Sequence, residues 1–583
     1  MTAVKKSKIQ KEKNNEISKT QKPKNTVKVK IDNNEVIEIR SGMKVCEVAE
    51  YLGSGLYLQA AAGLINNKIV DLSFPITKDC GLKIVTLDTL LGMKVYRRSV
   101  EYVLEIAVKE LYGSKARLLV GPHIEKGYYF DLIRENGEYN DTVSLKDIED
   151  IRAKMHEIIA RNLKFEVKKI TKTQAKKIFA KRPEVLELLD VISSNEIKIY
   201  YQKDTGFADF HHGPIFPNTG YIKAFDLLIS APGFILQFPD YVNKVLIMPK
   251  QPKQLKLTQV LKDTREWYKI QGVENVGELN RILKSKSETS ELIKIAEAFQ
   301  EKKVAEIADM IVSKKDAIKF ITIAGPSSSG KTTFAKRLSI QLKVNGIFPI
   351  ALSLDDYFVE RELTPRDENG NYDFEVIDAL DLKLINEHLA ALLKNKPIDV
   401  PRFDFTTGHR KKETHRMELK PGQVVILEGI HGLNDRLTAT VPSENKFKIY
   451  ISALNQLRID DINRIPTTDC RLIRRMVRDS KFRSYSAQET IARWPSVRRG
   501  EERHIFPFQE NADIIFNSAL IYELAVLKKY ALPILEEVPK NSPEFPIAES
   551  LISFLMLFRD CPENEIPPTS IMREFIGGSS FDY

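Results

Sequence analysis

The chain has 583 residues, of which 43% are hydrophobic and 29% charged, and its formal net charge is +10. One hydrophobic core does not support this length, so we expect three or four domains. No apolar run approaches the roughly 20 residues that cross a bilayer, and no apolar signal segment follows the start. The four cysteines are scattered without zinc-ligand spacing, as is typical of reduced thiols. We therefore expect a soluble cytoplasmic protein without a membrane partner, and a homo-oligomer.

Residues 1–25 hold much of the excess positive charge, as lysines that alternate with Asn, Gln and Ser. Few apolar residues interrupt them, and such a composition cannot build a core, so it predicts a disordered basic arm. Two roles stay open for this arm, a solubilising tail and contact with RNA. It lacks the arginines that are typical of organelle transit peptides.

Residues 26–90 alternate apolar and polar side chains in the manner of a small sheet. The pattern predicts a strand pair around 33–34, a short helix over 45–52, a hairpin over 64–70 and a closing strand over 82–87. These elements, with the segment Ala-Ala-Ala-Gly-Leu-Ile-Asn at 60–66, resemble a TGS domain of the β-grasp class, as found on threonyl-tRNA synthetases and some GTPases. The resemblance leaves RNA binding, regulation and simple packing open as roles.

Residues 91–249 start with a strong amphipathic helix pattern over 100–111. Two later stretches, 121–131 (Gly-Pro-His-Ile-Glu-Lys-Gly-Tyr-Tyr-Phe-Asp) and 212–225, resemble the second additional domain of threonyl- and alanyl-tRNA synthetases, which edits mischarged tRNA. The resemblance implies an α+β editing-like domain.

The metal site of that editing domain needs a His-xxx-His pair on the helix and a Cys-xxx-His pair on the later segment. The matching positions here hold Arg98 and Tyr102, then His211 and Ile215. Because one ligand of four remains, we expect the fold without the editing chemistry. Three histidines of the region either line a relic pocket or are satisfied structural residues. They are His123, His211 and His212.

Residues 250–315 are polar and rich in helical periodicity, and glycine and proline are nearly absent after Gly277. We expect a connector of packed helices rather than a loose tether. The remaining part, 316–583, begins with a strand pattern and ends in a helical extension.

A phosphate-binding loop is predicted at 320–334, Phe-Ile-Thr-Ile-Ala-Gly-Pro-Ser-Ser-Ser-Gly-Lys-Thr-Thr-Phe. An apolar run typical of a buried parallel strand leads into it, and helical spacing follows. The glycines let backbone N–H groups surround an anion, Lys331 reaches the terminal phosphates, and Thr332 can ligate Mg²⁺. The alternative is a glycine-rich turn with an incidental lysine. The expected nucleotide-binding residues are Gly325, Pro326, Ser327, Ser328, Ser329, Gly330, Lys331, Thr332 and Thr333.

Two further apolar strand patterns end in acids. The first, 348–354, leads into Asp355 and Asp356, and the second, 424–427, leads into Glu428. A carboxylate at the carboxyl end of a strand beside the phosphate loop can take the proton from an attacking hydroxyl, which we assign to Asp355. Glu428 is the expected second carboxylate for Mg²⁺. The alternatives are a turn cap for the former and an ordinary strand-end acid for the latter.

Four arginines recur at i, i+3, i+4 and i+7 on one predicted helix face, with apolar residues on the other. They are Arg471, Arg474, Arg475 and Arg478. Like charges at this spacing repel unless an anion offsets them, so we expect a lid over a triphosphate. A solvated face and contact with RNA phosphates stay open as alternatives.

These motifs resemble, in order over 316–525, the uridine kinase and phosphoribulokinase family. Further motifs of that family are 373–381 (Asp-Phe-Glu-Val-Ile-Asp-Ala-Leu-Asp), 403–405 (Phe-Asp-Phe) with 410–411, and 428–431 (Glu-Gly-Ile-His). The resemblance implies a P-loop kinase on a parallel sheet that uses ATP and Mg²⁺, with Asp355 as the base. It also implies Mg²⁺ contacts for Thr332, Asp355 and Glu428, and phosphate contacts for Lys331, Arg474, Arg475 and Arg478.

The acceptor side departs from the uridine kinase pattern. Phe358 replaces a nucleoside-contacting tyrosine, Glu375 replaces a ribose-binding aspartate, and His409 comes one residue later than the base-contacting histidine. Glutamate can still bind a vicinal diol, so ribose recognition survives these changes better than base recognition. We expect the acceptor to contact Phe358, Glu375, Phe403, His409 and Arg471.

The whole arrangement resembles bacterial uridine kinase-like proteins with a fused TGS and editing-like half, a multidomain combination of α/β and α+β folds. We expect an ATP-dependent kinase that phosphorylates the 5′-hydroxyl of a uridine- or cytidine-like nucleoside. A kinase acting on a sugar phosphate is one alternative. A nucleotide-switched, RNA- or ribosome-associated binding protein is the other.

Overall fold

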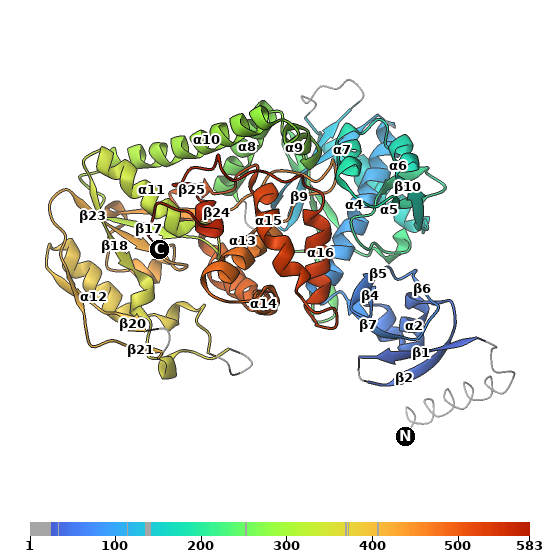
Figure 1. Ribbon diagram of the computed structural model, residues 1–583, viewed down its shortest axis with the longest axis horizontal. Coiled ribbons are helices and arrows are strands. Elements are labelled where there is room, and N and C mark those ends of the chain that lie inside the picture. Colours follow the sequence, from blue (N-terminus) through green and yellow to red (C-terminus); the bar gives the residue numbers. More distant parts are fainter. Residues whose placement is uncertain are drawn as a thin grey trace.

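The computed structural model describes residues 25–32, 34–113, 115–134, 142–250, 254–367, 370, 372–404 and 407–582. The expected basic arm, apart from Asn25, lies outside these described residues, as does Phe405 of the Phe-Asp-Phe motif. Figure 1 shows the kinase-like sheet at one end of the molecule and the N-terminal sheet at the other, with the editing-like part beside the latter. Among the described residues, no helix is both long and apolar enough to cross a membrane.

The N-terminal part is a five-stranded sheet in the order β2-β1-β7-β4-β5. Its buried and exposed residues alternate along β1 and β2, as the period of two in the sequence predicts. The strands and helices are β1 (Thr26–Ile31), β2 (Val36–Arg40), β3 (Met43–Lys44), α2 (Val45–Leu52), α3 (Ser54–Tyr57), β4 (Ala60–Ile65), β5 (Lys68–Val70), β6 (Pro75–Ile76) and β7 (Cys80–Thr86). Strand β1 pairs in parallel with β7, which makes this a β-grasp sheet.

The editing-like part is built around α4 (Leu90–Tyr112), which is buried on nearly all sides from Val95 to Val108. A four-stranded sheet in the order β13-β14-β9-β8 and a three-stranded sheet β10-β11-β12 pack around it. Its core is continuous with that of the N-terminal part. The elements are β8 (Arg117–Ile124), β9 (Gly127–Ile133), α5 (Leu145–Ala160), β10 (Glu166–Thr171), α6 (Lys172–Ile178), α7 (Pro183–Val191), β11 (Glu196–Gln202), β12 (Phe207–Phe210), β13 (Asp226–Ser230), β14 (Gly233–Gln237), β15 (Asp240–Val242) and β16 (Val245–Ile247).

The connector consists of α8 (Leu255–Ile270), α9 (Val276–Ile282) and α10 (Lys286–Val312). Its apolar face shares one core with the kinase-like part. Arg337 of α11 (Lys331–Val344) donates to Glu301 of α10 at 2.6 Å and to Gln300 at 2.6 Å. The connector is therefore packed helix, as its sequence predicts. We keep the five-part division of the chain as a proposal.

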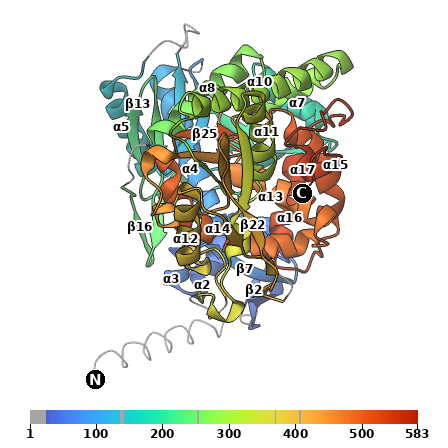
Figure 2. The same ribbon diagram turned by 90° about the vertical axis from the view of Figure 1, so that its left-hand side faces the viewer.

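The kinase-like part holds a parallel five-stranded sheet in the order β18-β23-β17-β24-β25. Its strands are β17 (Phe320–Ala324), β18 (Phe348–Ser353), β23 (Gln423–Glu428), β24 (Lys446–Ser452) and β25 (Ile514–Asn517). The small strands β19 (Ile398–Val400), β20 (Phe403–Asp404), β21 (His409–Arg410) and β22 (His415–Met417) form two hairpin-like pairs. In Figure 2, α12 (Leu382–Leu393) and β22 face the viewer at this end of the molecule.

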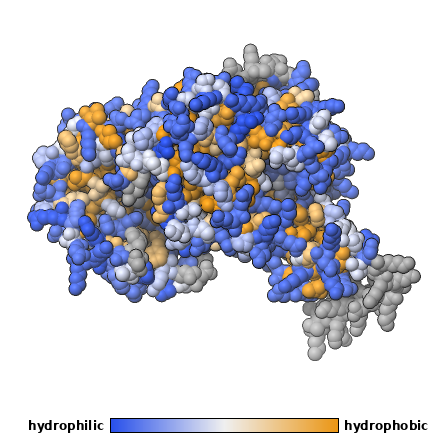
Figure 3. All heavy atoms as spheres, in the orientation of Figure 1, coloured by the Kyte–Doolittle hydropathy of each residue, from blue (hydrophilic) through white to orange (hydrophobic). Residues whose placement is uncertain are grey.

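The helical C-terminal extension folds back between the two halves. It continues from α13 (Thr467–Phe482) and α14 (Ala487–His504) through α15 (Glu523–Glu536), α16 (Phe545–Leu555) and α17 (Arg573–Ile576). Lys68 of β5 pairs with Glu549 of α16 at 3.0 Å, and Figure 1 shows these elements side by side. Figure 3 shows hydrophilic residues over most of the face in that orientation, with hydrophobic residues in separate patches.

Candidate active site

The phosphate loop lies between β17 and α11, as the sequence predicts. Gly330 begins α11 with a left-handed φ of 84°, which a glycine adopts without the cost that a side chain brings. A Cβ at Gly325 would lie 2.1 Å from the carbonyl oxygen of Ile451, so that position admits only glycine. The hydroxyls of Ser328 and Ser329 are buried and have no hydrogen-bond partner among the described residues. The loop thus presents polar groups that a ligand can satisfy.

Lys331, Thr332, Asp355 and Glu428 come together at the carboxyl ends of three adjacent strands. The Thr332 hydroxyl donates to Glu428 Oε1 at 3.0 Å. Burial lowers the pKa of Lys331, and the neighbouring Glu428 opposes that shift. Burial raises the pKa values of Asp355 and Glu428, and in each case the charge of Lys331 opposes the rise. The cluster therefore combines one cation, two carboxylates and one hydroxyl close together.

These oxygen groups fit a magnesium ion chemically. Mg²⁺ takes hard oxygen donors and is usually held by one or two carboxylates together with substrate phosphates. Thr332 and Glu428 supply a hydroxyl and a carboxylate oxygen 3.0 Å apart, and Asp355 adds a second carboxylate nearby. The three side chains predicted to arrange Mg²⁺ would therefore hold it together.

The arginine face of α13 lies directly on the phosphate loop rather than above an open site. Arg475 Nη1 donates to the Ser327 hydroxyl at 2.9 Å, and Arg471 Nε donates to the Ser327 carbonyl at 3.1 Å. Arg478 contacts Asp479 at 3.3 Å and lies 15% exposed. Arg475 therefore borders the loop where phosphates would bind, and the charge of Arg478 acts on Lys331.

Arg471 and Arg474 differ from the sequence-based expectation, because they are only 1% and 0% exposed. Arg471 forms an ion pair with Glu501, and Arg474 with Glu523. Neither guanidinium faces an incoming ligand. Both support the loop from behind through backbone carbonyls, so the structure gives Arg474 no lid position and Arg471 no acceptor position.

Three carboxylates of this region escaped the sequence analysis, namely Glu501, Glu523 and Glu574. Glu501 Oε1 accepts from the backbone N–H of Ser327 at 3.0 Å, and Glu574 Oε2 accepts from the Thr333 hydroxyl at 2.6 Å. A buried arginine needs an anionic partner. The apolar residues next to the α13 arginines indicated that this helix is packed, and therefore that such acids exist. That signal does not say which acids they are.

The expected acceptor residues separate into two places. Phe358 and Phe403 lie 5.6 Å apart between ring centroids, and Phe374 lies 6.2 Å from Phe358. Burial, with the nearby Glu501, raises the pKa of Glu375 to about 7. The Glu375 side chain packs on Gly500 of α14. A Cβ added at Gly500 would lie 2.7 Å from the Cβ of Glu375. The expected acceptor residues therefore include an aromatic group and, at Glu375, a partly buried carboxyl.

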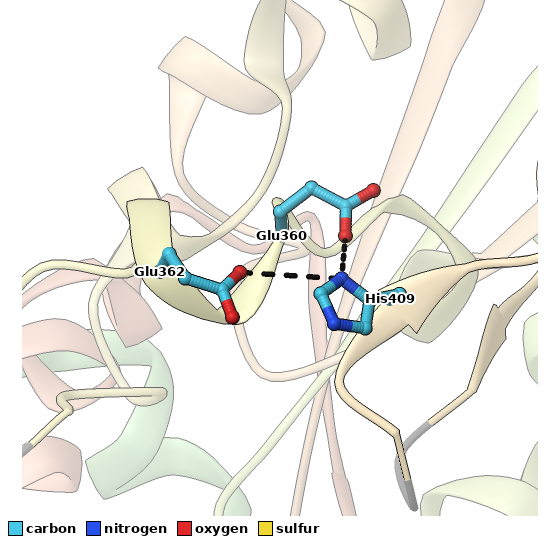
Figure 4. Close-up of side chains that lie close together, drawn as sticks. All are labelled: Glu360, Glu362 and His409. Atoms are coloured by element: carbon cyan, nitrogen blue, oxygen red, sulfur yellow. Dashed lines mark hydrogen bonds and ion pairs between the residues drawn. The ribbon is translucent and has the colours of Figure 1, made fainter.

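His409 lies on the rim, apart from these groups. Its ring Nδ1 is 2.6 Å from Glu360 and 4.0 Å from Glu362, and its side chain is 54% exposed (Figure 4). The three residues bring potential metal-ligand atoms within 4.8 Å of one another. Exposed acidic groups gather in this way without a metal, so the trio stands as a surface ion-pair cluster.

The positions that match the editing metal site hold a different arrangement. Arg98 donates to the Pro214 carbonyl at 3.0 Å, and Tyr102 donates to the Phe210 carbonyl at 3.0 Å. His211 stacks on Tyr200 at 4.6 Å and lies 3.5 Å from Asp71 of the N-terminal part. These groups are used in internal contacts, and no metal-ligand cluster occurs here within the described ranges.

The other two histidines also have internal contacts. His212 lies 2.9 Å from Asp460, which belongs to the loop between β24 and α13. His123 is packed edge-on against Tyr128 at 5.6 Å between ring centroids. The editing-like part is thus joined to the kinase-like part through His212.

Comparison with known proteins agrees with this arrangement. The sequence profile described as "Phosphoribulokinase / Uridine kinase family" matches residues 320–524. These residues form a kinase domain of that family. The profile of the TGS domain matches residues 27–86. The kinase domain is a P-loop phosphotransferase fold, and its family uses ATP and Mg²⁺ in general.

The N-terminal half is similar to threonine–tRNA ligases. It is 36% identical over 203 residues to the enzyme of Thermotoga maritima, covering 35% of this chain and 30% of that protein. It is 36% identical over 204 residues to threonine–tRNA ligase 2 of Bacillus subtilis, covering 34% of this chain and 31% of that protein. The chain thus spans less than a third of the length of these relatives.

Two solved structures are similar to parts of the chain at low identity. One is a putative fructose transport system kinase from Silicibacter sp. TM1040, with a TM-score of 0.27, 17% identity and coverage of 36% of this chain and 98% of that one. The other is a possible uridine kinase from Bacillus stearothermophilus, with a TM-score of 0.24, 20% identity and coverage of 36% and 97%.

Proposed function

We propose that this protein transfers the γ-phosphate of ATP to the 5′-hydroxyl of a nucleoside. The observation that carries the donor half is the Thr332–Glu428 hydrogen bond beside Lys331 and Asp355 at the carboxyl ends of three parallel strands. That edge is where open α/β sheets bind ligands. The cluster matches the parts that phosphoryl transfer requires, a phosphate cradle, a metal-binding pair and a base.

The chemistry follows from the positions of the charges. Asp355 accepts the proton of the acceptor hydroxyl as its oxygen forms a bond to the γ-phosphorus, and the bond from that phosphorus to the ADP oxygen breaks. Partial desolvation raises the pKa of Asp355 above the ordinary carboxyl value, which makes its carboxylate a stronger base. Lys331, Arg475 and Arg478 offset the charge on the transferred group. Mg²⁺, held by Thr332 and Glu428, would neutralise the phosphates further.

The acceptor half rests on the aromatic group and Glu375. Phe358, Phe374 and Phe403 offer ring faces on which a planar base can stack. Glu375 offers a carboxyl for a vicinal diol. The aromatic group favours a nucleoside over a sugar phosphate, because a sugar phosphate has no planar base to stack on it.

A product assay tests this proposal. Purified protein is incubated with Mg-ATP and a panel of nucleosides and sugar phosphates, and new phosphorylated products are identified by mass. We expect a nucleoside monophosphate. A phosphorylated sugar alone would move the proposal to the sugar-phosphate alternative. No product from any acceptor, together with ATP-sensitive RNA binding, would instead support a nucleotide-switched binding protein.

The Asp355→Asn variant tests the base. Turnover should fall by roughly 10²- to 10⁴-fold, as expected for loss of a general base, while ATP affinity stays near that of the wild type. Asp399→Asn on β19 is the matched control, because it makes the same change at an exposed residue of the domain. Substantial turnover by Asp355→Asn would remove Asp355 from this role.

A further inference from the structure

The last turn of the chain lies over the phosphate loop. We name residues 566–577 the tail segment. Four of its apolar side chains, Ile571, Met572, Phe575 and Ile576, are between 0% and 2% exposed. Ile571 lies so near the start of α11 that a Cβ at Gly330 would meet its Cγ2 atom at 2.8 Å. The tail segment therefore forms a wall of the nucleotide site.

Glu574 of the tail segment contacts the last residue of the phosphate-loop motif. Its Oε2 accepts from the Thr333 hydroxyl at 2.6 Å, and its Oε1 lies 3.7 Å from Arg478. The Glu574 side chain is 9% exposed. Its charge also acts on Lys331 and Glu428. The Thr333 hydroxyl, the Arg478 guanidinium and the Lys331 ammonium are groups that can bind phosphate oxygens, and the Glu574 carboxylate contacts the first two.

We propose that Glu574 is an internal anion that competes with nucleotide phosphates for the P-loop, which makes the tail segment an autoinhibitory contact. The proposal rests on the donor half of the proposed function and is independent of the acceptor. A carboxylate and a phosphate repel each other in a buried site, so bound ATP requires the Glu574 carboxylate to leave Thr333. Binding of ATP therefore includes the free-energy cost of breaking the Glu574–Thr333 hydrogen bond.

The contacts that anchor the tail segment indicate which of its groups can move when ATP binds. Ser570 donates to the buried Glu297, and Arg573 donates to the carbonyl oxygens of Glu563 and Ile566 at 2.9 and 2.7 Å. Arg474 also lies 5.0 Å from the centroid of the Phe575 ring. These contacts hold the backbone of the segment in place. We therefore expect the Glu574 side chain to rotate away while the segment stays.

The opposite role for Glu574 is a ligand to Mg-ATP, and the two roles predict opposite effects. An internal competitor weakens ATP binding, so its removal strengthens binding. A metal ligand supports ATP binding, so its removal weakens binding. The hydrogen bond to Thr333 and the proximity to Arg478 favour the competitor, because both are contacts made to an anion.

Equilibrium titration with Mg-ATP, without any acceptor, distinguishes these roles. We expect Glu574→Gln and Glu574→Ala to bind ATP at least about tenfold more tightly than the wild type. Glu565→Gln is the matched control, because this acid of the neighbouring turn contacts Ser290 and Lys294 instead of the loop. It should bind as the wild type does. Unchanged or weaker binding by the Glu574 variants, or no ATP binding by any protein, would overturn the proposal.

Glu574→Asp serves if the other variants do not fold. Its shorter side chain draws the carboxylate back from Thr333, so it should also bind ATP more tightly, by a smaller factor. Unchanged or weaker binding here overturns the proposal too. Tighter binding by these variants, combined with no phosphorylated product from any acceptor, would remove the kinase proposal and leave this inference standing.

Discussion

The donor site and the editing-like pocket are both polar clusters enclosed by distant parts of the chain, but they are closed in different ways. In the editing-like pocket, Arg98 and Tyr102 bond to fixed backbone carbonyls, and His211 contacts Asp71. In the donor site, Ser328 and Ser329 have buried hydroxyls without a partner among the described residues. The first cluster is a joint between domains, and the second retains capacity for a ligand.

The difference separates a structural cluster from a candidate ligand site. Arg98, Tyr102 and His211 each contact another part of the same chain, so these contacts stabilise the fold and leave few polar atoms for a ligand. In the donor site, the charges of Lys331, Asp355 and Glu428 act on one another without forming a closed set of ion pairs. Such groups are costly in a fold unless a ligand uses them. Variants in the two places should therefore affect different properties.

The largest contrast is expected between Lys331→Met and Arg98→Met. Lys331→Met should lower turnover by at least about 10³-fold, because cations on a transferred phosphoryl group contribute 10³- to 10⁵-fold in related sites. Its free energy of unfolding should change little. Arg98→Met should leave turnover near that of the wild type and cost about 1–3 kcal/mol of stability through its lost buried hydrogen bond. Steady-state kinetics and urea denaturation measure both. A folded Arg98→Met protein without turnover would contradict the separation.

A second comparison separates the arginines of α13. Arg474→Met leaves Glu523 buried without its cation, so we expect a loss of about 3–5 kcal/mol in unfolding free energy. Arg475→Met removes a partly exposed guanidinium from Ser327, so stability should change by less than about 1 kcal/mol while ATP binding weakens. Urea denaturation and ATP titration measure these effects. Equal destabilisation by both variants would show that Arg475 is structural as well.

The sequence was most informative where function follows from local spacing. The strand at 320–324 and the helix start at Lys331 follow from the P-loop pattern itself, because glycine positions, apolar runs and helix starts are local features. Asp355 and Glu428 could be placed together since parallel strands end at one edge. The β-grasp order and α4 were also predictable from period-two and helical patterns.

The partners of these elements could not be predicted in the same way. The spacing of the α13 arginines indicates an anion, but Glu501, Glu523 and Glu574 come from three separate later segments. No local pattern distinguishes an acid that will be buried from one that stays solvated. The same holds for Asp71, which reaches His211 from a different domain. Contacts between residues far apart in the sequence determine the structure of both sites. The sequence indicates that a partner is needed but does not identify it.

The last effect depends on pH and concerns Glu101 of α4, in the editing-like part. Burial raises its pKa to about 8, against the charges of Arg98, Arg464 and Arg97. Between the ordinary carboxyl pKa and this value, the unfolded chain releases a proton that the folded chain keeps. The wild type should therefore lose about 3 kcal/mol of unfolding free energy relative to Glu101→Gln as the pH rises from 5 to 7.5.

Urea denaturation of both proteins at the two pH values measures this change. Glu149→Gln, at an exposed residue of α5, is the control and should follow the wild type at both pH values. A constant difference between Glu101→Gln and the wild type would show that Glu101 is ionised in the folded protein, held by its arginines. The editing-like part would then hold an ionised carboxylate beside cations, as the donor site does, and the contrast between the two regions would narrow.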